Sequence, residues 1–411
     1  MKWSNEQLEA IRVNEGNVLI NAGAGSGKTA VLTEHVFHLL KNGAKLDRLL
    51  VLTFTNLASA EMKSRIRKKI ADPESGITEL VDKIDAAHIE TFDAFALYIV
   101  KKYHYVLNLP KNIGILDGTI ETIKKRKILD EIFDRHYEEK EPVFVEMISQ
   151  FADKDDKNIK DFILDIYRSV NLEIDQKSYI EKLKTNYCTD SFIEKVIEDL
   201  LTYYREQIYE IIALTQNENP SEEDSELIIE AMNEILTHDN YDDFISYLES
   251  KKFPTKRRHI EKNFGRDEAK DIYTKLKKKI YGNSEEIRAF IISKQDFSVL
   301  FVSLYEELQE RFNEFKSESN LYSFADIQMM ALSLIQNPAI SEEIKNSFDY
   351  IMVDEYQDTS DIQERVIQRL ANDNVFMVGD VKQSIYAFRN ANCTIFQKKY
   401  ELYKNKQGGK K

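Results

Sequence analysis

The sequence predicts an α/β domain that is interrupted by a large all-α insert. Two apolar runs near the start and two near the end have the length and composition of buried strands, and helical patterns follow the first two. Between them lies a long tract of amphipathic helical patterns with almost no strand signal. Only 6 prolines and 13 glycines occur in 411 residues, which fits a largely helical chain.

The first part of the α/β domain is predicted to span residues 1–108. "NVLINAG" is a buried strand that enters a glycine-rich loop, and the helix after it runs from Thr29 to Lys41, where Gly43 stops it. "RLLVLTFT" is a second strand and "LASAEMKSRIRKKI" a second helix. This alternation predicts a parallel sheet flanked by helices.

The insert is predicted at residues 109–320, where "IKKRKILDEIFDRHYEE" and "DFSVLFVSLYEELQERFNEF" are examples of amphipathic helices. The α/β pattern returns in residues 321–402 with the strands "FDYIMVD" and "NVFMVGD", each of which ends in an aspartate. Residues 403–411 are a polar tail. The simplest organisation is one α/β domain whose two parts flank the insert.

The composition limits the classes of function. The chain carries 71 acidic and 57 basic residues, a formal net charge of −14, so any polyanion must meet local patches or uncharged contacts. Cys188 and Cys393 lack metal-ligand spacing and fit inert, reduced thiols. The N-terminus has no apolar signal segment, and no run of about 18 apolar residues occurs, so we expect a soluble, cytoplasmic protein without a membrane partner.

The loop "AGAGSGKT" after the first strand predicts a site for a nucleoside triphosphate. Its backbone N–H groups are exposed, and the helix that starts at its end adds the positive pole of its dipole. We expect the amides of residues 25–29 to wrap the β-phosphate, Lys28 to reach the β- and γ-phosphate oxygens, and Thr29 to ligate Mg²⁺. The predicted nucleotide-binding residues of this loop are Ala22, Gly23, Ala24, Gly25, Ser26, Gly27, Lys28 and Thr29.

One position of this loop departs from the general P-loop pattern. Ala22 stands where the pattern has its first glycine, and alanine is tolerated there if its φ stays negative. The competing interpretation is a glycine-rich turn that binds nothing. The preceding strand, the following helix and the Lys28–Thr29 pair argue against that interpretation.

The run "YIMVDEYQD" supplies the acids that a P-loop site needs. Asp354 ends an apolar strand and therefore lies at the carboxyl edge of the sheet, where ligands bind in open α/β sheets. There it can hold Mg²⁺, and Glu355 is the natural general base for the attacking water. Alone, an Asp-Glu pair at a strand end more often caps a helix, but the P-loop in the same chain favours the nucleotide site.

Gln7, in the short amphipathic helix "WSNEQLEAI", is a candidate for reading the base. Its amide offers one donor and one acceptor, which match N6 and N7 of adenine, so it can select ATP over GTP. The alternative is a solvated surface glutamine, which is the more common situation for this residue type.

Six stretches occur in the order found in superfamily 1 UvrD/Rep-like DNA helicases. They are "WSNEQ", "AGAGSGKT", "LTFTNLASAEM", "TFDAF", "VDEYQDTSDIQ" and "VGDVKQSIYAFRNA". The opening Trp-x-x-x-Gln and the long helical insert resemble the RecB/AddA-like branch most closely. The resemblance spans Trp3 to about Ala391, nearly the whole chain, and "DEYQD" followed by "GDVKQSIYAFR" is its most specific part.

The resemblance implies a RecA-like P-loop NTPase domain that binds ATP and Mg²⁺. Lys28 and Thr29 correspond to Walker A, whereas Asp354 corresponds to Walker B and Glu355 to the catalytic base. Gln383 resembles the motif III glutamine, which couples the γ-phosphate to the DNA track. The implied catalytic residues are Lys28, Glu355 and Gln383, the ATP-binding set adds Gln7, which resembles the adenine-reading Q motif, and the Mg²⁺ ligands are Thr29 and Asp354.

The resemblance also implies contacts to single-stranded DNA. Tyr386, Phe388 and Arg389 look like a platform on which bases stack, a sequence-independent contact worth about 1–3 kcal/mol per base. The alternative is that these aromatic rings belong to the core. The implied DNA-binding residues are Phe54, Thr55 and Asn56 of motif Ia, Thr91 of "TFDAF", and Tyr386, Phe388 and Arg389.

Two positions depart from the family pattern near these contacts. Asp93 in "TFDAF" stands where the family commonly has histidine, and a carboxylate there repels phosphates, which argues against DNA contact at this residue. Leu57 replaces the usual lysine and removes one cation. His88 nearby is interpreted as structural rather than catalytic.

The chain reaches Lys411 where the motif IV of the family is expected to begin. Motifs IV to VI, the second RecA-like half and a nuclease domain of the RecB/AddA kind are not found in these 411 residues. Because arginine fingers contribute about 10³–10⁵ in rate to phosphoryl transfer, we expect this chain alone to bind ATP·Mg²⁺, to hydrolyse it weakly and not to unwind a duplex. The second half is then supplied by the same or a separate chain.

The preferred function is the ATP-binding half of an ATP-dependent DNA helicase or translocase on single-stranded DNA, with duplex DNA as a further partner. Family analogy implies 3′→5′ polarity, DNA repair or recombination, and partnership with a nuclease or repair subunit. The alternative is an ATP-dependent switch or assembly subunit of a repair or defence complex without unwinding activity. A small-molecule P-loop kinase is disfavoured, because it leaves "QSIYAFR" unexplained.

Overall fold

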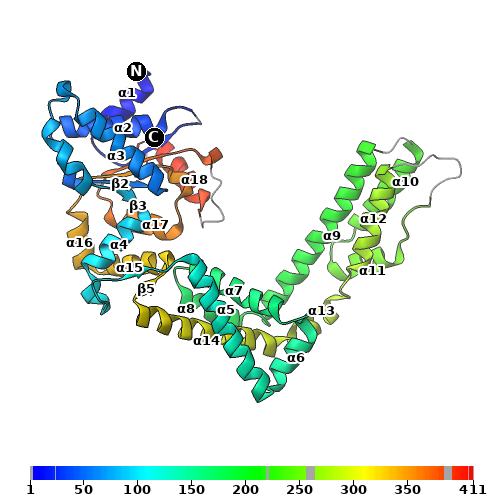
Figure 1. Ribbon diagram of the computed structural model, residues 1–411. Helices are drawn as coiled ribbons and strands as arrows, with labels where there is room; N and C mark the ends of the chain where they lie inside the picture. Colours follow the sequence, from blue (N-terminus) through cyan, green and yellow to red (C-terminus); the bar gives the residue numbers. More distant parts are fainter. Residues whose placement is uncertain are drawn as a thin grey trace. The chain divides into compact units, whose positions relative to one another are not determined.

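The computed structural model describes residues 3–23, 25–218, 222–255, 264–383, 391–405 and 407–410. The chain divides into two compact units, and Figure 1 shows the elements of both. The first unit comprises Met1–Ile128 and Glu310–Lys411, and the second comprises Leu129–Gln309. The boundaries fall within two long helices, α5 (Gly118–Glu139) and α14 (Gln295–Ser319), which contribute residues to both units.

A five-stranded parallel sheet with the order β1-β7-β6-β2-β3 forms the centre of the first unit. Its strands are β1 (Val18–Asn21), β2 (Leu49–Thr53), β3 (His88–Thr91), β6 (Tyr350–Val353) and β7 (Val375–Gly379). In register, β1 pairs with β7 from Val18 opposite Phe376 to Asn21 opposite Gly379. All residues of β2 and β7 are buried, as expected for a parallel sheet covered on both faces.

Helices cover both faces of this sheet. Figure 1 shows α2 and α3 over one face and α4, α15 and α17 over the other. The helices of this unit, besides α5 and α14, are α1 (Asn5–Arg12), α2 (Lys28–Lys41), α3 (Asn56–Ile70), α4 (Phe92–Lys102), α15 (Phe324–Gln336), α16 (Pro338–Lys345), α17 (Asp361–Leu370) and α18 (Cys393–Lys404). Under α2 and α3, Leu32, Val36, Met62 and Ile66 are fully buried against the strands. The predicted α/β fold with a parallel sheet flanked by helices is confirmed.

The four strands that the sequence predicts are present, and β3 was missed. The sequence of β3, "HIET", contains one large apolar residue, Ile89, and the strand pairs only with β2 at the edge of the sheet. Two further short strands, β4 (Gly114–Ile115) and β5 (Leu321–Tyr322), pair in parallel. They bring the segment before α5 next to the segment after α14.

All elements described in the second unit are helices. They are parts of α5 and α14, together with α6 (Pro142–Phe151), α7 (Lys157–Leu172), α8 (Gln176–Thr185), α9 (Asp190–Glu218), α10 (Glu222–Leu236), α11 (Tyr241–Ser250), α12 (Phe264–Lys278) and α13 (Ser284–Ser293). The helices α9 to α13 share a core in which Tyr204, Ile208, Phe244 and Leu248 are fully buried. Among the described residues, no helix is both long and apolar enough to cross a membrane.

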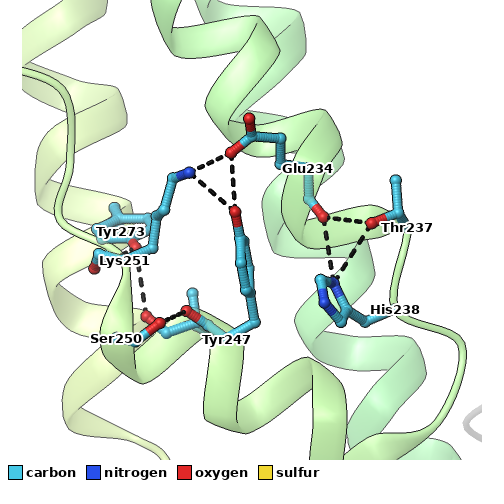
Figure 2. A network of polar contacts seen from close by, with 8 residues as sticks. Glu234, Thr237, His238, Tyr247, Ser250, Lys251 and Tyr273 are labelled. Carbon is cyan, nitrogen blue, oxygen red and sulfur yellow. Dashed lines mark hydrogen bonds and ion pairs between the residues drawn. The ribbon is translucent and has the colours of Figure 1, made fainter.

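A polar network joins three helices of this core (Figure 2). The Glu234 carboxylate of α10 accepts hydrogen bonds from the Tyr247 hydroxyl of α11, at 2.8 Å, and from Lys251 Nζ. Lys251 Nζ also donates to the Tyr247 hydroxyl at 2.9 Å, and the Tyr273 hydroxyl of α12 donates to the Lys251 carbonyl at 2.9 Å. His238 stacks on Tyr247, with 4.4 Å between ring centroids.

Candidate nucleotide-binding site

Three neighbouring strands end where the predicted nucleotide-binding residues lie. β1 leads into the P-loop, β6 leads into Asp354 and Glu355, and β7, which lies between them, leads into Asp380. Because the strands are parallel, their carboxyl ends share one edge of the sheet, where open α/β sheets bind ligands. The Ala22 N–H donates to the Gly379 carbonyl at 3.0 Å, so the start of the P-loop is joined to the end of β7.

The P-loop bends through two glycines in the left-handed region. Gly25 has φ 73° and Gly27 has φ 81°, conformations in which a side chain would be strained. Gly27 is the N-cap of α2 and gives the helix no side-chain cap, which leaves the first N–H groups of α2 directed at an anion. The Ser26 N–H donates to the Gly23 carbonyl at 3.2 Å. Ala24 lies outside the described residues.

Lys28 brings the three predicted catalytic residues together. Its side chain is 8% exposed, and Nζ donates to Glu355 Oε2 at 3.0 Å and to Gln383 Oε1 at 2.9 Å. These partners come from the loop after β6 and from the 3₁₀ helix η6 (Val381–Gln383). A buried ammonium group requires such partners, and phosphate oxygens would satisfy the same requirement.

Thr29 and Asp354, the predicted Mg²⁺ ligands, are hydrogen-bonded to each other through the Thr29 side chain. Asp354 is 4% exposed, and its burial, followed by the charge of Glu355, raises its pKa to about 6. The Glu355 N–H, the Lys28 charge and the Thr29 side chain oppose this rise. Mg²⁺ at phosphate sites takes hydroxyl and carboxylate oxygens, and a cation would compensate the buried carboxylate, so these two residues fit the ion.

The described residues contain no group of three or more His, Cys, Asp or Glu side chains that could hold a metal ion. A site of this kind does not need one, because Mg²⁺ at phosphates usually keeps several waters and takes only one or two protein carboxylates.

The carboxylate of Glu355 is also held by a residue that the sequence analysis did not single out. Gln357 Nε2 donates to Glu355 Oε2 at 2.8 Å, and Gln357 Oε1 accepts from the Asp380 N–H at 2.8 Å. Gln357 is 1% exposed. Its contacts depend on β7 being the neighbour of β6, which one sequence does not show; its place inside "DEYQD" was the available signal.

Asp380 is a second residue whose role the sequence did not reveal. Its Oδ2 accepts from Gln383 Nε2 at 2.7 Å, and its Oδ1 accepts from the Lys382 N–H at 3.0 Å. Asp380 is buried and therefore fixes the amide of Gln383, whose oxygen faces Lys28. The aspartate at the end of "NVFMVGD" was visible in the sequence, but its partner was not.

Gln7 connects α1 to the P-loop. Ser4 and Gln7 form a capping box at the start of α1, in which Gln7 Oε1 accepts from the Ser4 N–H at 2.9 Å. Gln7 Nε2 donates to the Ser26 carbonyl at 3.0 Å. The amide therefore lies beside the phosphate loop, and the contact with adenine remains a prediction.

The family description "UvrD/REP helicase N-terminal domain" matches residues 3–404 of this chain. The chain belongs to this family. The sequence-based resemblance is confirmed, since the similar curated proteins are helicase/nuclease subunits of the RecB/AddA-like kind.

Several curated proteins resemble this UvrD/REP family member along nearly its whole length. Three of them, each named as an ATP-dependent helicase/nuclease subunit, illustrate the match. The protein from Pediococcus pentosaceus is 28% identical over 99% of this chain and 36% of its own length. The proteins from Clostridium botulinum and Lactobacillus johnsonii are 30% and 31% identical over 99% and 98% of this chain, each over 37% of its own length. The chain therefore spans little more than a third of these relatives.

The DNA-binding candidates that the structure describes follow β2 and β3 in this UvrD/REP domain. Thr55 is the N-cap of α3 and accepts from the Ala58 N–H, and Thr91 is the buried N-cap of α4 and accepts from the Ala94 N–H. Phe54 is partly buried and Asn56 is exposed. β2 and β3 lie beyond β6 at the same carboxyl edge, so these candidates are separated from the P-loop by two strands. Tyr386, Phe388 and Arg389 lie outside the described residues.

The two departures from the family pattern have clear surroundings. Asp93 Oδ1 accepts from Gln328 Nε2 at 2.6 Å, which links α4 to α15. Leu57, in the first turn of α3, is 79% exposed. His88 is half-buried and pairs through Nδ1 with Glu90 Oε1 at 2.8 Å. Its ring packs against Tyr98 and Phe348, which fits the structural interpretation.

Proposed function

We propose that this chain is the ATP-binding half of an ATP-dependent DNA helicase or translocase that acts on single-stranded DNA. The observation that carries the proposal is the cluster at the carboxyl edge, where Lys28 contacts Glu355 and Gln383 and where Thr29 contacts Asp354. These groups come from two loops and one helix that are far apart in sequence. An arrangement of this composition fits the binding and hydrolysis of a magnesium-bound triphosphate.

Each residue of the cluster has a separate task in this proposal. The amides of residues 25–29 and the Lys28 ammonium bind the phosphates, and Gln7 selects adenine. Thr29 and Asp354 hold Mg²⁺, which neutralises the charge of the phosphate oxygens when it is bound. Glu355 accepts the proton of the attacking water, and Gln383 contacts the γ-phosphate. Since Lys28 is already paired with Glu355, arriving phosphates take over the ammonium and release the carboxylate for the water.

The first unit corresponds in this proposal to a RecA-like domain, and the helical tract at 109–320 to an all-α insert into it. DNA runs over the residues that follow β2 and β3, with Phe54, Thr55, Asn56 and Thr91 as contacts, and over the "SIYAFR" segment with Tyr386, Phe388 and Arg389. The names of the relatives support a role in DNA repair or recombination in the cytoplasm, 3′→5′ movement, and work together with a second RecA-like half and a nuclease or repair subunit.

The proposal is tested by nucleotide binding to the 411-residue chain. Wild-type chain should bind a fluorescent ATP analogue in a Mg²⁺-dependent manner, in competition with ATP and poorly with GTP. Lys28→Ala should abolish this binding, because the ammonium and its phosphate contacts are removed together. Normal affinity in the variant would contradict the phosphate site.

The DNA motor and the ATP-dependent switch are separated by a second measurement. Single-stranded DNA should stimulate ATP hydrolysis by the longer protein or complex that contains this chain. If hydrolysis depends on Lys28 but does not respond to DNA, the switch or assembly subunit is the better description.

A further inference from the structure

The residue that follows the proposed base is anchored in the interior. Tyr356 is 1% exposed, and its hydroxyl donates to Glu364 Oε2, in the first turn of α17, at 2.5 Å. Burial and then the charge of Glu364 raise the pKa of Tyr356 above its ordinary value, so its hydroxyl stays a donor. Tyr356 cannot contact the nucleotide phosphates itself, because its hydroxyl is directed at Glu364.

A lysine of α18 completes this buried group. Lys399 Nζ donates to Glu364 Oε1 at 2.7 Å and lies 4.9 Å from the centroid of the Tyr356 ring. Gln368 Nε2 donates to the same oxygen of Glu364 at 2.8 Å. Glu364 is 6% exposed, and the ammonium compensates its charge, whereas the ring of Tyr356 fills the space between α17 and α18.

Glu355 needs such an anchor because its backbone conformation is unfavourable. It has φ 49° and ψ 45°, in the left-handed region, which costs a residue with a side chain about 1–2 kcal/mol. A conformation of this kind persists only where the surroundings enforce it. Glu355 is also the residue whose carboxylate contacts Lys28 and Gln357. A small rotation at residue 355 or 356 would therefore move the carboxylate away from both.

We propose that Tyr356, Glu364 and Lys399 are positioning residues that hold the Glu355 backbone in its left-handed conformation and thereby aim its carboxylate at the reacting water. This inference rests on the proposed function, in which Glu355 is the general base. It makes α17 and α18, which carry Glu364 and Lys399, part of the support of the hydrolytic site. None of the three side chains takes part in a proton transfer.

The helix α18 is attached to the same loop at a second point. The Asn392 N–H, at the N-cap of α18, donates to the Thr359 carbonyl at 3.0 Å, and Asn392 Nδ2 donates to Asp361 Oδ2 at 3.0 Å. Phe396 of α18 also packs near Tyr356, with 6.0 Å between the ring centroids. The segment from Glu355 to Asp361 is thus fixed along its length by α17 and α18.

The test separates the position of Glu355 from the integrity of the fold. For each variant of the 411-residue chain, the stoichiometry of binding of a non-hydrolysable ATP analogue is measured first. Then the rate of hydrolysis per bound ATP is measured in single turnover with the chain in excess. Tyr356→Phe, which removes only the hydroxyl, should keep one analogue per chain with affinity within about twofold of wild type. Its rate should fall about 10- to 100-fold, as for a misplaced catalytic group.

Lys399→Met and Lys399→Arg provide a second route to the same answer. The methionine should lower the rate per bound ATP, and the arginine, which keeps the charge beside Glu364, should restore it. This pair decides the matter if Tyr356→Phe does not fold. Tyr273→Phe is the matched control, because it removes a hydroxyl bonded at 2.9 Å to a carbonyl in the second unit and should leave the rate unchanged.

The proposal is overturned if Tyr356→Phe and Lys399→Met fold and hydrolyse each bound ATP at the wild-type rate. It is also overturned if they lose binding stoichiometry and keep the rate of the remaining sites, which is the result of a purely structural role. Absence of any Lys28-dependent hydrolysis in wild-type chain is a different result, since it contradicts the proposed function itself.

Discussion

At the scale of single residues, the cost of burying a charge is largest to follow at Asp354. This carboxyl group is 4% exposed, and burial raises its pKa to about 6, above the 3.8 of an ordinary aspartate. Between these two values the folded chain binds more protons than the unfolded chain. Stability contributed by this group is therefore greatest at low pH and declines as the pH rises through the window.

We predict that Asp354→Asn stabilises the first unit at neutral pH in the absence of Mg²⁺ and nucleotide. The amide carries no charge to bury, so the variant should gain about 1–3 kcal/mol at pH 8, and this gain should vanish below about pH 4. Urea unfolding followed across this pH range measures the difference. The same variant should lose Mg²⁺-dependent ATP binding, which separates stability from function.

Asp349 offers a control of opposite sign in the same unit. Two hydrogen bonds from Arg48, at 2.6 and 2.7 Å, lower the pKa of Asp349 below its usual value. Asp349→Asn should therefore destabilise the chain at neutral pH and lose this effect as the carboxyl group of the wild type becomes protonated in acid. If both asparagine variants shift stability in the same direction, the assignment of the Asp354 effect to burial is wrong.

The geometry of the candidate site is only partly readable from the sequence. Lys28, Thr29 and the strand-end acids Asp354 and Glu355 are local patterns, and the structure brings them together as their spacing predicts, although their roles in binding and catalysis stay predictions. The role of Gln357 depends on β7 lying beside β6. No pattern within one segment contains that information, so contacts between strands distant in sequence were missed.

At the scale of elements, the same limit explains the strand that was missed. Central strands such as β2 are continuous apolar runs because both faces are covered, and such runs are easy to recognise. β3 lies at the edge, and its exposed positions carry His88 and Glu90, which pair with each other. Its sequence therefore lacks the apolar pattern, although its backbone pairs with β2 in parallel register.

His35 joins three elements on the side of α2 that faces β7. It is 2% exposed, its ring stacks on Phe376 of β7 with 4.2 Å between centroids, and its Nδ1 lies 2.9 Å from the Ile11 carbonyl of α1. Burial lowers the pKa of His35 to about 4, from the ordinary 6.5. Between these values the unfolded chain binds more protons, so this stability is lost as the pH falls.

We predict that the protonation of His35 weakens the packing of α1, α2 and β7 in acid. The unfolding free energy of wild-type chain should lose about 2–3 kcal/mol through this group between pH 6.5 and 4. His35→Asn keeps a donor near the Ile11 carbonyl but does not titrate there. It should be less stable than wild type at pH 7 because the ring stacking is lost, and this deficit should shrink as the pH approaches 4.

The measurement is urea unfolding of both chains at several pH values. Asp354 contributes with the opposite sign in part of this window, so the difference between variant and wild type is informative and the absolute slope is not. A deficit of His35→Asn that stays constant from pH 7 to 4 would contradict the buried, neutral state of this histidine.

At the scale of the whole molecule, the two units have separate cores. The core of the first unit lies between the sheet and the helices α2 and α3, and the core of the second lies among α9 to α13. The network of Glu234, Tyr247 and Lys251 in Figure 2 stabilises only helices of the second unit. Since all residues of the candidate nucleotide site belong to the first unit, the second core can be weakened without altering that site.

A single tryptophan makes this independence measurable. Trp3 is the one tryptophan of the chain, and it packs beside Ala10, Ile11 and Val31 in the first unit. Its fluorescence therefore reports unfolding of the first unit, whereas far-ultraviolet circular dichroism reports the helices of both units.

We predict that Phe244→Ala lowers only the transition of the second unit. Phe244 is fully buried among α9 to α13, and its truncation should cost that unit about 3–5 kcal/mol through lost burial and the cavity left behind. The circular dichroism transition should begin at lower urea, while the Trp3 transition and the affinity for the ATP analogue stay unchanged. Leu32→Ala, the matched truncation in the first core, should shift the Trp3 transition and weaken nucleotide binding at intermediate urea. If Phe244→Ala moves both probes together by the same amount, the units unfold as one cooperative body and their independence is wrong.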